Sequence, residues 1–351
     1  MDWTRMGHQE LGRQTGVVVP AYFSARPPDD LVRRLLRLTL ADSHHYLPPG
    51  QVWVVVDGDP RTARLAAEVQ EECRARVGEA FRLLVLEANG GKFRAVREGM
   101  RGLLAACPGL HYLAVRDCDG DHALADLPAL VRAAVELAEA QGSTDVLIAG
   151  ARSSRHHPMG WLRGELEALL DGVTLDALAY YLAREGRALD LTHAGGATGV
   201  PDISSGYKVY GRQAAERLFG DEPARLASLS ERDYWRYGPE TVPFVEAIVA
   251  GAAFGLAPRL TFDGQPTSSF GDLSVVGLYG ELLAWVATRL GIPLPAAAQM
   301  FDNRACTLLL RTTAEGAETL GLVRRHALER AAAHLGVPTP PIVARPLPTT
   351  L

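Results

Sequence analysis

The sequence predicts an α/β protein with a mostly parallel, Rossmann-like sheet flanked by helices and followed by a helical C-terminal extension. Short Val-rich runs alternate with longer amphipathic segments through the first two-thirds of the 351 residues. Near-continuous apolar strands separated by helices are typical of a parallel sheet that is covered on both faces. With 47% hydrophobic residues, the chain can also bury a large core.

Five runs are predicted to be strands, because each is compact, apolar and followed by turn residues. They are Thr15–Ala21, Gln51–Val56, Phe81–Leu86, His111–Val115 and Asp145–Ala149. Four amphipathic segments between them are predicted to be helices. They are Asp30–Leu40, Pro60–Val77, Lys92–Cys107 and Leu124–Ala140. Ligands of such sheets bind beyond the carboxyl ends of the strands, so the residues that follow each run are the candidates for chemistry.

The rest of the chain is predicted to be mainly helical. Its elements are a helical region at Met159–Val200 ending in a mobile Gly-rich loop (His193–Gly199), a loop that enters a strand (Asp202–Tyr210), a helix from Arg212, a helix at Tyr237–Ala253, and helices from Asp272 to Leu335 with a break at Gly291–Pro295. The predicted domains are a tail at 1–14, an α/β domain at 15–270, a helical extension at 271–336 and a Pro-rich tail at 337–351.

Composition narrows the function and the compartment. The net charge is −5 without a basic stripe, which argues against a nucleic-acid binder. Four scattered cysteines without metal-site spacing are typical of a reducing compartment. The N-terminus lacks a signal-peptide core, and no stretch of about 20 apolar residues predicts a transmembrane helix. We therefore expect a cytoplasmic protein, at most peripheral to a membrane.

The strongest candidate site follows the predicted strand His111–Val115, where Arg116–His122 reads RDCDGDH. Mg²⁺ and Mn²⁺ prefer oxygen ligands and are commonly held by one or two carboxylates together with substrate phosphates. Asp117 and Asp119, separated by Cys118, fit that role, since one carboxylate can bind the metal while the other positions a water or a ribose. The alternative is an acidic turn that caps the next helix.

Two other strand ends carry candidate groups. Asp57 closes the run VWVVVD, and it could accept hydrogen bonds from a nucleobase or ribose or simply form an Asp-Gly turn. The segment Asn89–Lys92 reads NGGK. Its glycines, including Gly91, would let the backbone approach a ligand, and Lys92 could neutralise phosphate. The P-loop spacing is absent, so a plain glycine turn before a helix is the alternative.

Charged residues further along the chain complete the set of candidates. Arg152 and Arg155 follow the fifth predicted strand and could bind a diphosphate or an anionic acceptor, because a guanidinium matches phosphate geometry. Asp202 and Glu240 are candidate general bases. The alternative for Glu240 is a residue that complements the helix dipole, and Glu246 is the rival acid.

Taken in order, these segments resemble the family-two GT-A glycosyltransferases, particularly the polyprenyl-phosphate sugar synthase branch. VVVPAYF, VVVDGDP and NGGKFRAVREGM are similar to the nucleotide-binding segments of the family, and RDCDGDHALADLPALV resembles its metal motif D-A-D-G-Q-H. IAGARSS, SSGYKVYGRQAAERL and YGPETVPFVEAIVAGAAFGLAPRLTF are similar to its later segments. The resemblance spans about residues 16–270. It departs from the family pattern at Phe93, where a small residue is usual, at Asp121 in place of Gln, and at Val242 in place of an acid.

The resemblance implies a GT-A fold with a nucleotide-sugar half at about 15–122 and an acceptor half at about 123–270. It implies a UDP- or GDP-sugar donor and a divalent metal, Mn²⁺ or Mg²⁺, held by Asp119 and Asp117. The donor-binding residues would be Pro20, Ala21, Tyr22, Asp57, Gly91, Lys92, Asp117, Cys118, Asp119 and Arg152. The acceptor-binding residues would be Ser204, Ser205, Gly206 and Arg155, and the catalytic residues Glu240 and Asp202.

The expected function is therefore metal-dependent transfer of a sugar from a nucleotide-diphosphate donor to an acceptor, with inversion by family analogy. The acceptor stays open between a small metabolite, a nucleoside, a peptide and a lipid phosphate. The alternatives are a sugar nucleotidylyltransferase, although PAYFSARP lacks its Gly-rich loop, and a non-catalytic nucleotide-sugar-binding protein, against which the intact D-x-D argues. A homodimer formed through the C-terminal helices is a further candidate assembly.

Overall fold

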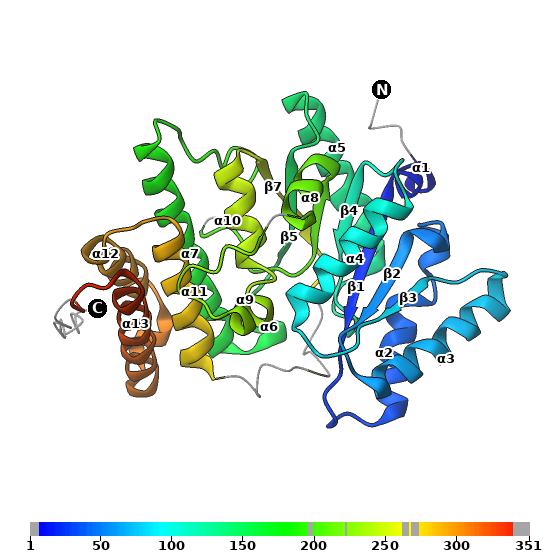
Figure 1. The fold of residues 1–351 in the computed structure, drawn as a ribbon, viewed down its shortest axis with the longest axis horizontal. Coiled ribbons are helices and arrows are strands. Elements are labelled where there is room, and N and C mark those ends of the chain that lie inside the picture. The colour runs from blue at the N-terminus through cyan, green and yellow to red at the C-terminus, as the bar shows by residue number, and fades with distance from the viewer. Residues whose placement is uncertain (1–6, 196–198, 222, 262–266, 268–273, 340–351) are drawn as a thin grey trace. The chain divides into compact units, whose positions relative to one another are not determined.

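The computed structural model describes residues 7–195, 199–221, 223–261, 267 and 274–339 of the chain (Figure 1). The chain divides into two compact units. The first comprises residues 1–154, 190–223 and 232–269, and the second comprises residues 155–189, 224–231 and 270–351. Two segments of the predicted α/β domain thus belong to the second unit, because the helix within 155–189 packs with the C-terminal helices.

A seven-stranded sheet forms the centre of the first unit. Its strands are β1 (Thr15–Ala21), β2 (Val52–Val56), β3 (Arg82–Val85), β4 (Tyr112–Val115), β5 (Val146–Arg152), β6 (Lys208–Gly211) and β7 (Ala253–Arg259). They lie in the order β3-β2-β1-β4-β6-β5-β7. β6 runs antiparallel to β4 and β5, and the other neighbouring pairs are parallel. The predicted α/β class with a mostly parallel sheet is therefore confirmed.

β1 lies in the interior of the sheet because its sequence, TGVVVPA, is apolar almost without a break. All of its residues are buried. Residues 17–21 pair with β2, and residues 15–18 pair with β4. A strand that is buried on both faces shows no alternation of apolar and polar residues, which is the pattern on which the prediction of a parallel sheet depended.

The first unit contains α-helices in addition to the sheet. They are α1 (His8–Arg13), α2 (Asp29–Leu40), α3 (Pro60–Val77), α4 (Lys92–Ala106), α5 (Leu127–Gln141), α8 (Arg212–Phe219), α10 (Thr241–Ala250) and, from its second residue, α9 (Glu231–Tyr237). α3 begins after Asp59, whose side chain accepts a hydrogen bond from the N–H of Thr62. It ends at Gly78, which has a φ of 84°. The four helices predicted between the first five strands are thus confirmed.

Two predicted segments of the first unit differ in part from the structure. Residues 8–13 form helix α1 where a tail was expected, because Leu11 is buried and anchors the segment. The helix predicted over Tyr237–Ala253 is present as α10, which is shorter at both ends, and the strand β7 that follows it was not predicted. β7 was missed because Gly255 and Pro258 weaken its strand pattern, while pairing along β5 holds it in place.

The two edges of the sheet are short or covered. β3 forms one edge with four residues, and its exposed Arg82 places the guanidinium carbon 5.4 Å from the ring centroid of Trp53. At the other edge, His193 forms a bridge to Gly255 of β7 and accepts a hydrogen bond from the N–H of Leu256 at 3.0 Å. The predicted mobile loop His193–Gly199 is therefore anchored at its first residue, while residues 196–198 lie outside the described chain.

The second unit is helical. It contains α6 (His156–Met159), α7 (Trp161–Arg184), α11 (Val275–Arg289), α12 (Leu294–Ala305) and α13 (Ala314–Leu335). The predicted C-terminal helices and the break near residues 291–295 are confirmed, although the helical region 159–200 ends at residue 184. Residues 340–351 of the predicted Pro-rich tail lie outside the described chain. Throughout the described residues, each helix is too short or too polar to cross a membrane.

Buried charges in the second unit have partners within it. Arg155, predicted to bind the acceptor, donates a hydrogen bond to the fully buried Asp171 at 2.5 Å. In the pair of helices α11 and α13, Oε1 of Glu281 lies 3.0 Å from Nε2 of His326 and 2.8 Å from Nε of Arg330. Arg155 thus has a local structural partner in a unit other than the one that contains the sheet.

Two glycines with the same backbone conformation offer a test of how tightly the sheet end is packed. Gly58 and Gly142 both have a φ of 64°. A Cβ on Gly58 would lie 2.1 Å from the backbone of Ala88, whereas one on Gly142 would meet nothing within 4 Å. We expect Gly142→Ala to cost about 1–2 kcal/mol from backbone strain alone. Gly58→Ala should cost at least about 3 kcal/mol, because overpacking adds to the strain.

The free energy of unfolding of the two variants, measured by urea denaturation, checks this expectation. Equal losses for Gly58→Ala and Gly142→Ala would show that the turn after β2 yields to the added methyl group.

Candidate functional site

The candidate site lies at a switch point of the sheet. β1 has β2 on one side and β4 on the other, so the connections that leave the carboxyl ends of β1 and β4 diverge there. In α/β sheets, ligands bind at the carboxyl ends of the strands beside such a point. The segment that contains Asp117 and Asp119 follows β4 at this position.

Lys92 joins two acids from distant parts of the sequence. Its Nζ lies 2.9 Å from Oδ1 and 3.2 Å from Oδ2 of Asp117, and 2.7 Å from Oε1 of Glu240. The ammonium thus faces both carboxylate oxygens of Asp117, with the geometry of a hydrogen bond to Oδ2 and a close ionic contact to Oδ1. Burial by itself would lower the pKa of Lys92, but the charges of Asp117 and Glu240 outweigh it and raise the pKa. The ammonium is therefore charged at neutral pH.

Asp57 fixes the loop that carries Lys92. Its two carboxylate oxygens accept hydrogen bonds from the N–H groups of Gly90 and Gly91, each at 2.8 Å. Gly91 has a φ of 101°, and a Cβ there would lie 2.5 Å from the carbonyl oxygen of Trp235, so only glycine fits. Asp57 thus has a structural role in this loop, and its contact with a nucleotide stays a prediction.

An aromatic cluster brings Glu240 to the start of α4. Phe93 packs against Phe219, Tyr234 and Trp235, with ring centroids 6.5, 5.5 and 5.4 Å apart. This contact explains why a large residue stands at position 93, and it holds α9 against α4. Glu240 follows α9 and precedes α10, but its side chain makes no capping hydrogen bond there. A purely capping role for Glu240 is therefore not what the structure shows.

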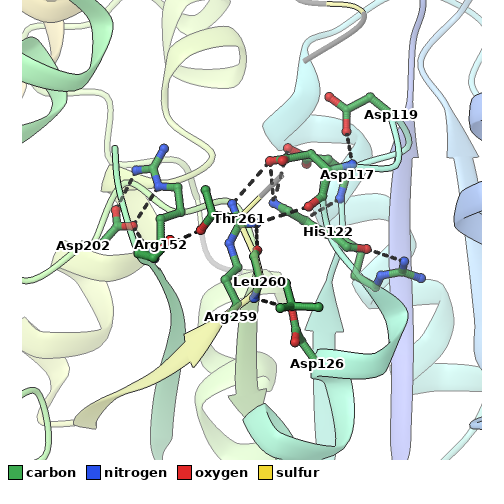
Figure 2. Close-up of polar contacts among 12 residues, drawn as sticks. Asp117, Asp119, His122, Asp126, Arg152, Asp202, Arg259, Leu260 and Thr261 are labelled. Carbon is green, nitrogen blue, oxygen red and sulfur yellow. Dashed lines mark hydrogen bonds and ion pairs between the residues drawn. The ribbon is translucent and has the colours of Figure 1, made fainter. Parts of the chain in front are cut away.

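The loop after β4 is held by buried polar contacts. Arg116 donates hydrogen bonds to the carbonyl oxygens of Thr39 at 3.1 Å and of His122 at 2.6 Å. The N–H of Asp117 donates to Nδ1 of His122 at 3.0 Å (Figure 2). The imidazole stacks on the ring of Tyr207 at 4.9 Å. Burial lowers the pKa of His122 well below its usual value, so the ring is neutral and carries its proton on Nε2.

The remaining acids of this loop differ in their surroundings. The N–H of Asp121 donates a hydrogen bond to Oδ1 of Asp119 at 3.2 Å. Asp121 is itself buried, and its Oδ2 lies 3.3 Å from a guanidinium nitrogen of Arg259. Burial, followed by repulsion from Asp117, raises the pKa of Asp119 to about 7. Ionised Asp119 is thus the least compensated charge of the loop.

These acids fit a divalent cation whose coordination a ligand completes. Among the described residues, no group of three or more His, Cys, Asp or Glu is arranged to hold a metal ion. Mg²⁺ and Mn²⁺ commonly use one or two carboxylates, with waters and substrate phosphates supplying the other ligands. Asp119 offers an undercompensated carboxylate, and Asp117 offers a second carboxylate beside it, whose charge Lys92 balances in this structure. Asp117 and Asp119 therefore stay the predicted metal ligands.

Arg152 and Asp202 pair with each other. Nε and Nη2 of Arg152 donate to Oδ2 and Oδ1 of Asp202 at 2.8 and 2.6 Å, and Figure 2 shows the two side chains turned towards one another. The side chains are only 3% and 6% exposed. The sequence suggested separate roles, on the donor for Arg152 and as base for Asp202. In this structure the guanidinium and the carboxylate of Asp202 form a buried ion pair, so both predicted functional groups are engaged with one another.

The segment before β6 reaches the site through Gly206. A Cβ on Gly206 would lie 3.1 Å from Oδ2 of Asp117 and 3.4 Å from Nζ of Lys92. Ser204 is partly buried and Ser205 fully buried, and the hydroxyl of Ser205 finds no hydrogen-bond partner in the described residues. Gly206 therefore borders the ion pair directly.

The end of β1 supplies the other predicted donor-binding residues. Pro20 and Ala21 are buried in the strand, whereas Tyr22, just beyond it, is 47% exposed. Cys118 is buried between the two acids of the loop after β4, and burial raises the pKa of its thiol. Tyr22 is thus the member of this group that is open to a ligand.

Two residues of the site were not predicted to have a role. His122 ends the motif RDCDGDH, but nothing in the spacing of the motif shows that its ring would accept a hydrogen bond from the N–H of Asp117. Arg259 lies 138 residues from Asp121, and a buried arginine looks in the sequence like a surface one. In the sequence, Arg259 stands out only as part of the segment APRLTF, which is similar to a segment of the resembled family.

The fold and the site define an α/β protein with an acidic, strand-end site. A scan against protein-family models finds no match, and a search of curated proteins finds no significant relative. Because α/β sheets of this kind carry many unrelated activities, any functional assignment depends on the residues of the site.

We expect Asp119→Asn to raise the Tm of the metal-free protein, and more at pH 8 than at pH 5. The raised pKa means that ionisation of Asp119 in the fold costs free energy that grows as the pH rises towards about 7. At pH 5 the folded protein still holds the proton, so less is gained by removing the charge. The increase at pH 8 should be on the order of 2–4 °C in thermal unfolding with a chelator. A pH-independent increase would contradict the assignment, and exposed Asp30→Asn is the control.

We expect Arg152→Met to destabilise the protein by about 3 kcal/mol, because it leaves the buried carboxylate of Asp202 without its guanidinium. The pair Arg37–Glu72 is the control, since its two hydrogen bonds of 2.7 and 2.6 Å have similar geometry at 48% and 44% exposure. Arg37→Met should cost less than about 1 kcal/mol. Urea denaturation measures both, and similar losses would mean that burial does not set the importance of the Arg152 pair.

Proposed function

We propose that this chain is a metal-dependent glycosyltransferase of the GT-A type, which moves a sugar from a nucleotide-diphosphate donor to an acceptor. One observation carries the proposal: Asp117, Lys92 and Glu240 meet at the carboxyl end of β4 beside the switch point of the sheet. These residues come from three of the segments that resemble the family. Asp117 supplies a carboxylate that can bind a cation, Lys92 an ammonium that can bind phosphate, and Glu240 a carboxylate that can contact the acceptor.

Asp119 and Asp117 would hold the cation, Mn²⁺ or Mg²⁺. A bound cation of this kind supplies positive charge that stabilises a leaving diphosphate. Lys92 offers a further positive charge, and its side chain is 33% exposed, so it can reach a bound phosphate. Charges that are fixed where negative charge develops stabilise the transition state with little reorganisation.

Glu240 is the candidate general base for a hydroxyl acceptor. With 25% of its side chain exposed, it can take the hydroxyl proton while the acceptor oxygen attacks the anomeric carbon. The bond from that carbon to the diphosphate oxygen breaks, and the nucleotide leaves with the electron pair. A phosphate acceptor is already ionised and needs no base. Glu240 is paired with Lys92, but the rival Asp202 is paired with Arg152 and only 6% exposed, and Glu246 lies in the middle of α10.

A nucleotide-sugar-binding protein without catalysis is the second candidate. One observation favours it: Lys92 already compensates both Asp117 and Glu240, so the cation ligand and the candidate base are engaged with an internal ammonium. The two candidates differ in one measurable respect. A glycosyltransferase slowly transfers the sugar to water when no acceptor is present, whereas a binding protein leaves the donor intact.

We expect one family of nucleotides, uridine or guanosine diphosphates and their sugars, to raise the Tm of the wild type when Mn²⁺ is present. Ligand at a hundredfold excess over its Kd adds ~2.7 kcal/mol of stability. Asp119→Ala should abolish the Mn²⁺-dependent part of the shift, while the exposed control Asp30→Ala should keep it. Thermal shift over a nucleotide panel, with and without Mn²⁺, measures this. A panel without any nucleotide response would overturn the proposed function.

A further inference from the structure

Three residues of the site, Asp117, Glu240 and Gly206, surround the ammonium of Lys92. Its Nζ faces both carboxylate oxygens of Asp117, at 2.9 and 3.2 Å, and Oε1 of Glu240 at 2.7 Å. A Cβ on Gly206 would come within 3.4 Å of the same Nζ. Lys92 therefore occupies the space in front of the Asp117 carboxylate, where the positive charge of a bound cation would otherwise lie.

A divalent cation and this ammonium compete for the same carboxylate. A cation of this class binds a carboxylate oxygen at about 2.0–2.1 Å, which on the Nζ side of Asp117 would bring it against the ammonium. Two positive charges at contact distance in a partly buried site repel strongly. The cation can therefore bind Asp117 on this side only when the ammonium has moved.

Lys92 is able to move while its backbone stays in place. Its backbone begins α4, and the loop before it is held by Asp57 through the N–H groups of Gly90 and Gly91. Its side chain has a flexible four-carbon stem and is 33% exposed. A new anionic partner beside the site is enough to compensate the ammonium after it leaves Asp117.

We propose that Lys92 is a resident counter-ion that keeps a divalent cation off Asp117 until a nucleoside diphosphate draws the ammonium away. The inference rests on the proposed function, because the cation and the nucleotide donor are those of the proposed reaction. Cation and donor then enter the site together, and the cation alone binds poorly. Lys92 acts first as the occupant of the cation site and then as a partner of the donor phosphates.

The test measures binding of Mn²⁺ alone, without nucleotide, by the loss of the free-ion electron paramagnetic resonance signal. Lys92→Met should bind Mn²⁺ at least tenfold more tightly than the wild type. Arg94→Met is the matched control, because Arg94 is an exposed residue of the same first turn of α4. It removes the same charge without uncovering Asp117, and its Kd for Mn²⁺ should stay within twofold of the wild type. Equal affinities of Lys92→Met and wild type would overturn the inference, as would an equal gain in Arg94→Met.

A second pair of variants separates displacement of the ammonium from a change in net charge, and protects the test against misfolding of Lys92→Met. Glu240→Gln together with Lys92→Met removes one charge of each sign and relieves the repulsion between Asp117 and Glu240. This double variant has the net charge of the wild type and should still bind Mn²⁺ at least tenfold more tightly than the wild type. Lys92→Arg keeps a cation beside Asp117 and should bind Mn²⁺ as poorly as the wild type does. A double variant that gains nothing would overturn the inference.

A nucleotide arm distinguishes failure of the inference from failure of the proposed function. Uridine diphosphate and guanosine diphosphate are added separately, and one of them should tighten Mn²⁺ binding to the wild type at least tenfold but change Lys92→Met much less. If neither nucleotide binds with or without Mn²⁺ while Lys92→Met still gains Mn²⁺ affinity, the proposed donor is wrong and the competition at Asp117 stands. If the nucleotide binds and tightens Mn²⁺ binding equally in both proteins, the proposed function stands and the role of Lys92 as counter-ion is wrong.

Discussion

Compensation of buried charge is the constraint on which the site depends. A carboxylate or an ammonium that is removed from water loses several kcal/mol of hydration, and only a close opposite charge with good hydrogen bonds recovers it. At the carboxyl end of the sheet these pairs are Lys92 with Asp117 and Glu240, Arg152 with Asp202, and Arg259 with Asp121. Each pair joins segments that are far apart in the sequence. The apolar sheet therefore sets where the loops begin, and the ion pairs set where their side chains lie.

The fold could be predicted from the sequence wherever one physical pattern was dominant. β1, β2, β4 and β5 are near-continuous apolar runs, and burial on both faces of a sheet requires that pattern, whereas the partly exposed edge strand β3 was predicted from its apolar run alone. β7 escaped prediction because its residues follow an apolar helix without a polar interruption, and Gly255 and Pro258 are poor strand formers. Only pairing with β5 makes this segment a strand, and pairing between distant segments is a tertiary contact. α1 was missed for the same reason, since a single buried side chain, Leu11, fixes a short polar helix.

The sequence identified individual residues of the site, but not which of them form ion pairs with one another. Strand ends in a parallel sheet meet at one edge, so Asp117, Asp119 and Lys92 were expected at the same place. Glu240 lies 148 residues from Lys92, and no local pattern indicates that the two touch. An ion pair also changes the role that a residue can have. In the sequence Asp202 is a candidate base, but in the structure its carboxylate accepts two hydrogen bonds from the guanidinium of Arg152. The sequence shows which groups are available, whereas the fold decides which of them are already satisfied by one another.

The edges of the sheet have a consequence for the behaviour of the protein at high concentration. An open strand edge is a template on which another copy of a chain can add a strand, which leads to aggregation. At one edge β3 is short and carries the charged Arg82, and at the other the segment at His193 already pairs with β7. Both are devices that natural sheets use to discourage edge-to-edge association. Addition of a strand from a second copy is therefore disfavoured at both edges of this sheet.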